Sequence, residues 1–259
     1  MNLSEKVALV TGGLSGIGAS CVEEFLKNGI KGVVVADISS REDIIQNFNA
    51  KYGERRVTFV KADVSDRKSF ANAFQETVNT YDNIDILINA AGIGDENNWQ
   101  RLIQVNLVGP ALGCELAINT YFPKYKSGAN AYVITISSIV GIIPYRGAPH
   151  YAAAKHGLIG LTRSYGENKV VTEQGIFIMA LCPGRTDTPM VNSPSLGKTL
   201  YSDQLLEDIN ALPPQQPEAV SRSVIEILQA PQHGSVWVIQ DSKLSKVELL
   251  TYQTLTASL

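Results

Sequence analysis

The sequence has little net charge and few cysteines. Its 259 residues hold 22 Lys and Arg against 25 Asp and Glu, a net charge of −3, so there is no basic excess to hold nucleic acid or an anionic membrane surface. The cysteines are odd in number and widely spaced (Cys21, Cys114 and Cys182), which excludes a disulfide framework and indicates reduced core thiols. We therefore expect an intracellular protein that binds a small molecule.

Long hydrophobic runs are also missing near the start. The polar stretch Met1 to Lys6 leads into an apolar run, Val7 to Thr11, that is too short for a signal sequence or a membrane span. The last residues, Ala257 to Leu259, are similar to a peroxisomal Ser-Lys-Leu end but lack its basic residue. We expect no membrane segment and a cytoplasmic location, with peroxisomal import as the alternative.

Short runs of β-branched residues recur along the chain, with helical patterns between them. They are apolar at consecutive positions, which is typical of parallel strands buried on both faces. These runs are Val7–Val10, Val33–Ala36, Val57–Val60, Ile84–Ile88, Ala131–Ile136, Ile176–Leu181 and Val236–Ile239. They predict an α/β fold in one domain over 1–259: a Rossmann-like, doubly wound, mostly parallel sheet of about seven strands with helices on both faces.

Two regions interrupt this pattern. The segment of about 184–217 is rich in proline and holds one short helical pattern near 201–210, which is typical of a loop that covers a substrate. The tail of about 241–259 is too apolar for a solvated end. We expect the tail to pack on its own domain or on a neighbouring subunit.

A glycine-rich turn follows the first predicted strand and opens a helix. Gly12, Gly16 and Gly18 would let backbone N–H groups approach a pyrophosphate at the helix N-terminus. The next strand ends in Asp37, 19 residues after Gly18, where an acid binds the ribose hydroxyls of a dinucleotide. The alternative is a tight turn with a surface Asp, but the position of the turn favours dinucleotide binding.

Two Tyr-x-x-x-Lys pairs occur at helical spacing, and their context separates them. Tyr151 and Lys155 would lie one turn apart on one helix face, as would Tyr165 and Lys169. Only Tyr151 has a serine 13 residues before it, Ser138, at the end of a predicted strand. Tyr151 is therefore the candidate for chemistry, and an ordinary helix tyrosine is the alternative.

Together with the glycine turn, these residues resemble the short-chain dehydrogenase/reductase family from Lys6 to about Thr188. The resemblance implies hydride transfer between a carbinol carbon and a nicotinamide, with NAD as the cofactor and no metal. It implies a catalytic set of Asn106, Ser138, Tyr151 and Lys155. The cofactor-binding positions that it implies are Gly12, Leu14, Ser15, Gly16, Ile17, Gly18, Asp37, Ile38, Asp63, Val64, Asn89, Ala90, Ala91, Gly92, Tyr151, Lys155, Pro183, Gly184, Thr186 and Thr188. One departure is Ile88, which stands where the family has the first Asn of an Asn-Asn-Ala-Gly stretch.

The resemblance also gives each catalytic residue a role. Tyr151 would take the hydroxyl proton, but a phenol with a pKa near 10 is a poor base at neutral pH. Lys155, together with the positive charge of oxidised nicotinamide, is expected to lower that pKa. Ser138 would orient the substrate oxygen, and Asn106 would hold a water in a proton path.

Two branches of the family share further residues with this chain. The segments Asn97–Trp99, Lys155–Leu158 and Leu161–Ser164 resemble the 15-hydroxyprostaglandin dehydrogenase branch, which is NAD-dependent. The segment Gly234–Trp237 and the tail resemble the insect-type alcohol dehydrogenases. Ala148 stands where the prostaglandin branch has a glutamine.

The residues expected around the substrate are mostly apolar. They are Ile139, Ile142, Ile143, Pro144, Tyr145 and His150 beside Ser138 and Tyr151, with Met190 and Leu205 within reach from the loop of about 184–217. The nearby Arg146 is expected to face solvent. This set favours an apolar secondary or allylic alcohol of terpenoid or medium-chain size. The alternatives are a 15-hydroxyprostaglandin-type hydroxy-fatty-acid dehydrogenase and a non-catalytic binding relative of the same fold.

Two predicted helices carry apolar residues on more than one face. They span Trp99–Phe122 and Tyr151–Lys169, and their apolar residues are Leu107, Val108, Leu112, Leu116, Ile118, Leu158, Ile159 and Leu161. We expect these helices to form a homodimer, which a second interface could extend to a homotetramer.

Overall fold

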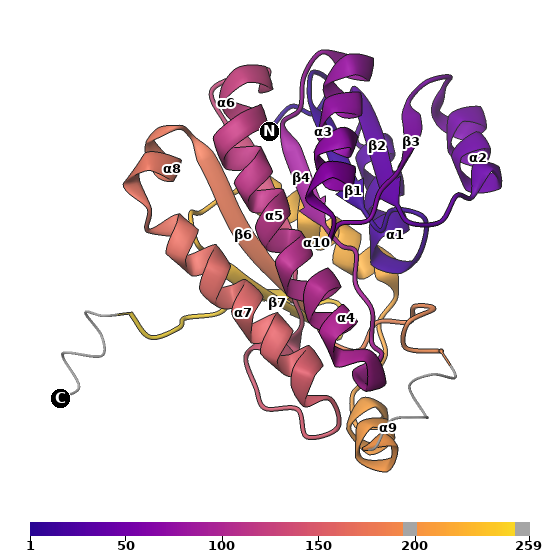
Figure 1. Cartoon of the computed structure of the whole chain (residues 1–259), viewed down its shortest axis with the longest axis vertical. Coiled ribbons are helices and arrows are strands. Elements are labelled where there is room, and N and C mark those ends of the chain that lie inside the picture. The colour runs from indigo at the N-terminus through magenta and orange to yellow at the C-terminus, as the bar shows by residue number, and fades with distance from the viewer. Residues whose placement is uncertain (194–200, 252–259) are drawn as a thin grey trace.

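The computed structural model describes residues 1–193 and 201–251 and contains one sheet (Figure 1). The order of its strands is β3-β2-β1-β4-β5-β6-β7-β8, with every neighbouring pair parallel except β7 and β8. Their bounds are β1 Val7–Thr11, β2 Gly32–Asp37, β3 Val57–Lys61, β4 Ile86–Asn89, β5 Ala131–Ile136, β6 Ile176–Pro183, β7 Val236–Gln240 and β8 Lys243–Lys246. The predicted doubly wound fold is confirmed, with one strand more than expected.

The extra strand, β8, lies within the predicted tail. It pairs antiparallel with β7 after a turn in which Asp241 and Ser242 have positive φ. β8 is an edge strand with one apolar residue, Leu244, so it lacks the hydrophobic run that marks the other strands. Beyond it, Val247 and Leu249 pack on a small cluster, and residues 252–259 of the predicted tail lie outside the described residues.

Helices cover both faces of the sheet (Figure 1). Those of the first half are α1 Gly16–Lys27, α2 Glu42–Tyr52 and α3 Arg67–Tyr81, followed by one helical run of η1 Glu96–Asn98, α4 Trp99–Ile103, η2 Gln104–Val108, α5 Gly109–Leu116, η3 Ala117–Tyr121 and α6 Phe122–Tyr125. The second half has η4 Ile139–Gly141, α7 Pro149–Gly166, α8 Lys169–Glu173, α9 Ser202–Asn210 and α10 Pro217–Gln229. The elements η2 and η3 are π-helical.

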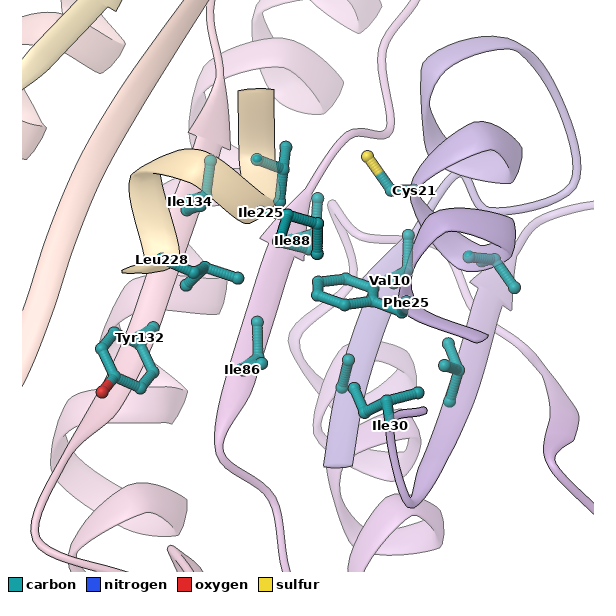
Figure 2. Close-up of a cluster of buried hydrophobic side chains, with 14 of the residues drawn as sticks. Val10, Cys21, Phe25, Ile30, Ile86, Ile88, Tyr132, Ile134, Ile225 and Leu228 are labelled. Carbon is teal, nitrogen blue, oxygen red and sulfur yellow. The ribbon is translucent and has the colours of Figure 1, made fainter. Parts of the chain in front are cut away.

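Each central strand gives alternate side chains to two cores. In β1, Val10 lies in the core under α1 and α10, whereas Leu9 lies in the core under α3, α5 and α7. Figure 2 shows the first of these cores, where Phe25 of α1 and Leu228 of α10 face the strands. Burial on both faces explains why the strands are apolar at consecutive positions.

The helical run from Glu96 to Tyr125 is long and apolar enough to cross a membrane by length and composition alone, but 56% of its most apolar stretch is buried inside the fold. Leu102, Cys114 and Phe122 of this run are fully buried. That burial is typical of a core helix that packs on a sheet.

The strand order reverses between β1 and β4. Ligands of open parallel sheets bind at such a reversal, outside the carboxyl ends of the strands. Thr11 and Asn89 end the two strands there. The fold therefore places a binding site where the sequence has its glycine turn.

Candidate active site

A cavity of about 480 Å³ opens at the carboxyl ends of the strands. Most of the predicted site residues line it, although they come from segments far apart in the sequence. The predicted residues that line it are Gly12, Ser15, Gly16, Ile17, Gly18, Asp37, Ile38, Asp63, Val64, Ala90, Ala91, Gly92, Ser138, Ile139, Tyr145, Tyr151, Lys155, Pro183, Gly184, Thr186 and Thr188. Leu14, Asn89, Asn106 and His150 are not among its lining residues.

The glycine turn has the shape of a cradle for a dinucleotide. Gly12 and Gly16 have φ of +66° and +52°, which favours glycine, and a Cβ on Gly18 would lie 2.2 Å from the carbonyl oxygen of Gly12. Ser15, the N-cap of α1, makes no side-chain capping bond. The first-turn N–H groups of α1 are thus available to an anion, and the turn fits a pyrophosphate.

Asp37 ends β2 beside this turn. Its carboxylate accepts from the N–H groups of Leu14 at 3.4 Å and Ser39 at 3.3 Å. Leu14 is buried, so its place in the site is to hold Asp37 and not to line the cavity. Arg41, the basic residue nearest in sequence, forms an ion pair with Asp43 at 2.9 Å.

Asp63 is held by two partners that sequence reasoning missed. The N–H and hydroxyl of Ser65 donate to its Oδ1, and Arg101 donates to its Oδ2 at 2.7 Å. Burial alone would raise the pKa of Asp63, but these bonds outweigh it and lower that pKa. Arg101 itself lines the cavity.

The stretch after β4 forms one wall of the cavity. The N–H groups of Ala90 and Ala91 donate to Thr11 Oγ1 at 3.0 and 3.1 Å. Asn89 is buried below them and donates to the Pro110 carbonyl at 3.5 Å. Asn89 therefore supports the wall from beneath and does not itself line the cavity.

Tyr151 and Lys155 lie one turn apart on α7, beside Ser138 at the end of β5. Burial raises the pKa of Tyr151 to about 12 and lowers the pKa of Lys155 to about 8. The Lys155 ammonium donates to the Ile136 carbonyl at 2.9 Å and lies 5.4 Å from the centre of the Tyr151 ring. In the protein alone, Lys155 thus does not bring the pKa of Tyr151 below its ordinary value.

Asn106 lies in the π-helical segment η2, and the oxygen and the nitrogen of its side-chain amide both bind the backbone of Ile93. Its Oδ1 accepts from the Ile93 N–H and its Nδ2 donates to the Ile93 carbonyl, both at 2.8 Å. π-helical segments are common at functional sites, and this one directs Asn106 toward the loop after β4.

The predicted substrate contacts divide into two groups. Ile139 and Tyr145 line the cavity, and burial raises the pKa of Tyr145, which keeps its phenol protonated. The ring of His150 instead contacts Glu96 Oε2 at 2.8 Å and stacks on Trp99. His150 is therefore held by a buried acid in η1 and is not among the residues that line the cavity.

The segment that covers the cavity contributes Leu205 and Met190, which were expected near the substrate, and Arg185, which was not. Leu205 of α9 packs on Ala148 and Tyr151, and the cavity is also lined by Arg185, whose Nη1 donates to the Ile209 carbonyl at 3.3 Å. The Arg146 side chain is 55% exposed, as expected, and it also pairs with Glu207 and Asp208 of α9 at 2.8 and 2.9 Å. The partners of Arg146 and Arg185 could not be predicted from the sequence, because both sets of contacts depend on where α9 lies in the fold.

Tyr165 packs in the core under α5 and α7 and does not line the cavity, so the two Tyr-x-x-x-Lys pairs differ in the structure as they do in sequence context. Within residues 1–193 and 201–251, no three His, Cys, Asp or Glu side chains are grouped to hold a metal ion.

Comparison with known proteins identifies the family of this chain. The family model for short chain dehydrogenases matches residues 6–198. Curated relatives include 15-hydroxyprostaglandin dehydrogenase [NAD(+)] of Rattus norvegicus, 31% identical with 94% of each chain covered, and that of Homo sapiens, 29% identical with 94% of each chain covered. Alcohol dehydrogenase 2 of Ceratitis cosyra is 27% identical, with 97% of this chain and 98% of that protein covered. Because the family model spans most of the chain and the relatives align over nearly all of it, the chain belongs to the short chain dehydrogenase family.

Proposed function

We propose that this chain is an NAD-dependent oxidoreductase that oxidises apolar secondary or allylic alcohols of terpenoid or medium-chain size. The observation that carries the proposal is one cavity in which Ser138, Tyr151 and Lys155 meet a glycine cradle and an apolar wall. The relatives named NAD(+)-dependent dehydrogenases support the choice of cofactor. So does Asp37, which would bind ribose hydroxyls at the end of β2.

The cradle and Asp37 would hold NAD, with the residues after β6 near its nicotinamide end. When bound, NAD supplies the hydride acceptor and a positive charge beside the carbinol carbon. Ser138 donates a hydrogen bond to the substrate oxygen and orients it. Tyr151 takes the hydroxyl proton, and Lys155 provides a second positive charge one helical turn away.

Proton transfer in this site needs a change in the ionisation of Tyr151. With a pKa raised to about 12 by burial, the phenol alone is a poor base at neutral pH. Lys155, whose pKa is lowered to about 8, is still mostly protonated at pH 7 and keeps its charge. Both positive charges are therefore needed to stabilise the phenolate, and turnover should rise with pH up to about 8, where Lys155 begins to lose its own proton.

The substrate side of the cavity is mainly apolar. It is lined by Ile93, Ile139, Met190, Val191, Leu205, Ile209 and Leu212. Each buried methylene contributes about 0.8 kcal/mol, so longer apolar alcohols should bind better until the cavity is filled. Arg185, the cation in this part of the lining, favours a second candidate function, in which a hydroxy fatty acid places its carboxylate there.

The test is a series of alcohols at fixed NAD and alkaline pH. We expect kcat/KM to rise roughly 10- to 100-fold when the alcohol is lengthened by three carbons. Tyr151→Phe should lower turnover by several orders of magnitude, whereas its control, Tyr165→Phe, should keep it. A flat profile, or an active Tyr151→Phe enzyme, would contradict the proposal. A preference for hydroxy acids that Arg185→Ala removes would establish the second candidate.

A further inference from the structure

Glu96 is a buried acid in η1, and its side chain contacts the first turn of α7, the helix that carries Tyr151. Its exposed fraction is 8%, and both of its carboxylate oxygens bind α7. Oε1 accepts from the Tyr151 N–H at 2.7 Å, and Oε2 accepts from the His150 N–H at 3.3 Å and contacts His150 Nδ1 at 2.8 Å. Because a buried carboxylate is unfavourable unless it is bonded, these contacts fix Glu96 in one place.

The helix α7 has no cap of its own. Its N-cap, Ala148, has no polar side chain, and its first residue, Pro149, has no N–H. The next two N–H groups, of His150 and Tyr151, are those that an N-cap side chain normally binds. Glu96 lies 54 and 55 residues before them and supplies the acceptor in place of the missing cap. Its charge also suits the positive end of an 18-residue helix.

The same acid joins α7 to the wall of the cavity. Three residues before Glu96, the backbone of Ile93 is bound by Asn106 through two contacts of 2.8 Å. The stacking of Trp99 on His150, with ring centres 5.1 Å apart, adds a second contact between the same two segments. A loss of Glu96 would therefore release the first turn of α7, which holds Tyr151, from the loop after β4.

We propose that Glu96 is a positioning residue, which fixes the backbone of Tyr151 so that its hydroxyl stays in place for proton transfer. The proposal rests on the proposed function, because it takes Tyr151 as the base. A purely structural cap would affect only the stability of α7, whereas removal of Glu96 is expected to lower turnover because the Tyr151 hydroxyl is then less well positioned.

The test compares three variants. Glu96→Ala removes the acceptor, Glu96→Gln keeps one oxygen for the Tyr151 N–H, and Asn168→Ala removes the N-cap bond of α8, away from the cavity. We expect kcat to fall at least about tenfold in Glu96→Ala and to stay within about threefold of wild type in Glu96→Gln. Asn168→Ala should keep the wild-type kcat, and the Kd for NAD should be unchanged in all three.

Two further measurements separate positioning from general stability. In a Tyr151→Phe background, Glu96→Ala should cause no further loss of the residual turnover, because both changes act through one group. Without substrate, amide hydrogen exchange at Tyr151 should be faster in Glu96→Ala and unchanged in Asn168→Ala.

A Glu96→Ala enzyme with the wild-type kcat would overturn the proposal, as would an equal loss in the Tyr151→Phe background. If Glu96→Ala does not fold, a Glu96→Gln enzyme with wild-type kcat and faster exchange at Tyr151 would overturn it as well. If the wild type oxidises no alcohol, the proposed function fails, and unchanged exchange at Tyr151 in Glu96→Ala would show separately that Glu96 does not hold that residue.

Discussion

Asp37 is the residue on which the choice between NAD and NADP depends. A 2′-phosphate at the end of β2 would place like charges about 4 Å apart, which costs about 4 kcal/mol at an effective dielectric of 20. Arg41 is 58% exposed and paired with Asp43, and because an exposed ion pair contributes about 0 to 1 kcal/mol, Arg41 would offset only a small part of this cost. We expect NAD to exceed NADP by at least about a hundredfold in kcat/KM, and Asp37→Ala to lose most of that preference. Glu42→Ala, which removes a charge at the start of α2, is the control, and equal turnover of both cofactors by the wild type would contradict this assignment.

The buried charge of Lys155 should reduce the free energy of unfolding at neutral pH. Burial lowers its pKa from 10.5 to about 8, so below pH 8 both the folded and the unfolded chain hold the proton and the folded chain carries a buried charge. Between pH 8 and 10.5 the folded chain releases the proton first, and stability rises with pH. The difference between the two pKa values corresponds to about 3 kcal/mol.

Lys155→Met should therefore raise the free energy of unfolding at pH 7 by up to about 3 kcal/mol, less about 1 kcal/mol for the lost bond to Ile136. The gain should shrink as the pH approaches 10, and turnover should be lost. Denaturant titrations at pH 7 and 9.5 would measure it. Lys169→Met, at the exposed start of α8, is the control and should leave the free energy of unfolding unchanged at both pH values. A Lys155→Met protein that is less stable at pH 7 would show that the buried charge is not unfavourable.

At the scale of elements, α9 is held over the site by the packing of Leu205, by the ion pairs of Arg146 and by the bond from Arg185 to the Ile209 carbonyl. Leu205 is 2% exposed and packs with Ala148 and Tyr151, and a Cβ on Gly147 would lie 2.5 Å from the Leu205 Cα. The Arg146 side chain is 55% exposed, and exposed ion pairs contribute about 0 to 1 kcal/mol. The apolar contact should therefore control how α9 closes the cavity.

Leu205→Ala should raise the KM for a medium-chain alcohol by about tenfold, because it loosens α9 and removes a wall of the cavity. Arg146→Ala should change that KM less than about twofold. Steady-state kinetics with one alcohol and saturating NAD would compare them. The reverse order of effects would mean that the ion pair, and not the packing, holds α9.

The elements that the sequence predicts best are those whose side chains carry a hydrophobic pattern. The central strands are visible because both of their faces are buried, as Val33 and Val34 of β2 show by facing opposite cores. β8 could not be predicted from its one apolar residue, and the π-helical turn at Asn106 leaves no mark in composition. In the site, the glycine turn follows from its position after the first strand, and Tyr151 and Lys155 follow from their spacing together with Ser138, 13 residues before Tyr151. The role of Glu96 could not be predicted, because an acid in a short helical turn has the same local sequence whether its side chain faces solvent or a distant helix.

At the scale of the whole molecule, much of the predicted apolar stripe on the two long helices is already covered. Leu116, Ile118, Leu158 and Ile159 are buried within the chain, so these four side chains are not exposed to a partner. What remains open is a different face of α7. It consists of Ala153, His156, Gly160 and Ser164, all exposed and spaced along one side of the helix.

This exposed face of α7 is where we expect a second copy of the chain to pack. It has no acidic or basic side chain apart from His156, and nothing lies within 4 Å of a Cβ built on Gly160. A glycine inside a helix costs about 1 kcal/mol relative to alanine, a cost that close approach of a second helix would offset. We expect the wild type to be a dimer at micromolar concentration by light scattering, and Gly160→Glu to shift it toward monomer because it buries an unpaired charge. Asn72→Glu, which adds the same charge to the exposed face of α3, should leave the dimer intact. A monomeric wild type, or equal dissociation in both variants, would contradict a dimer through α7.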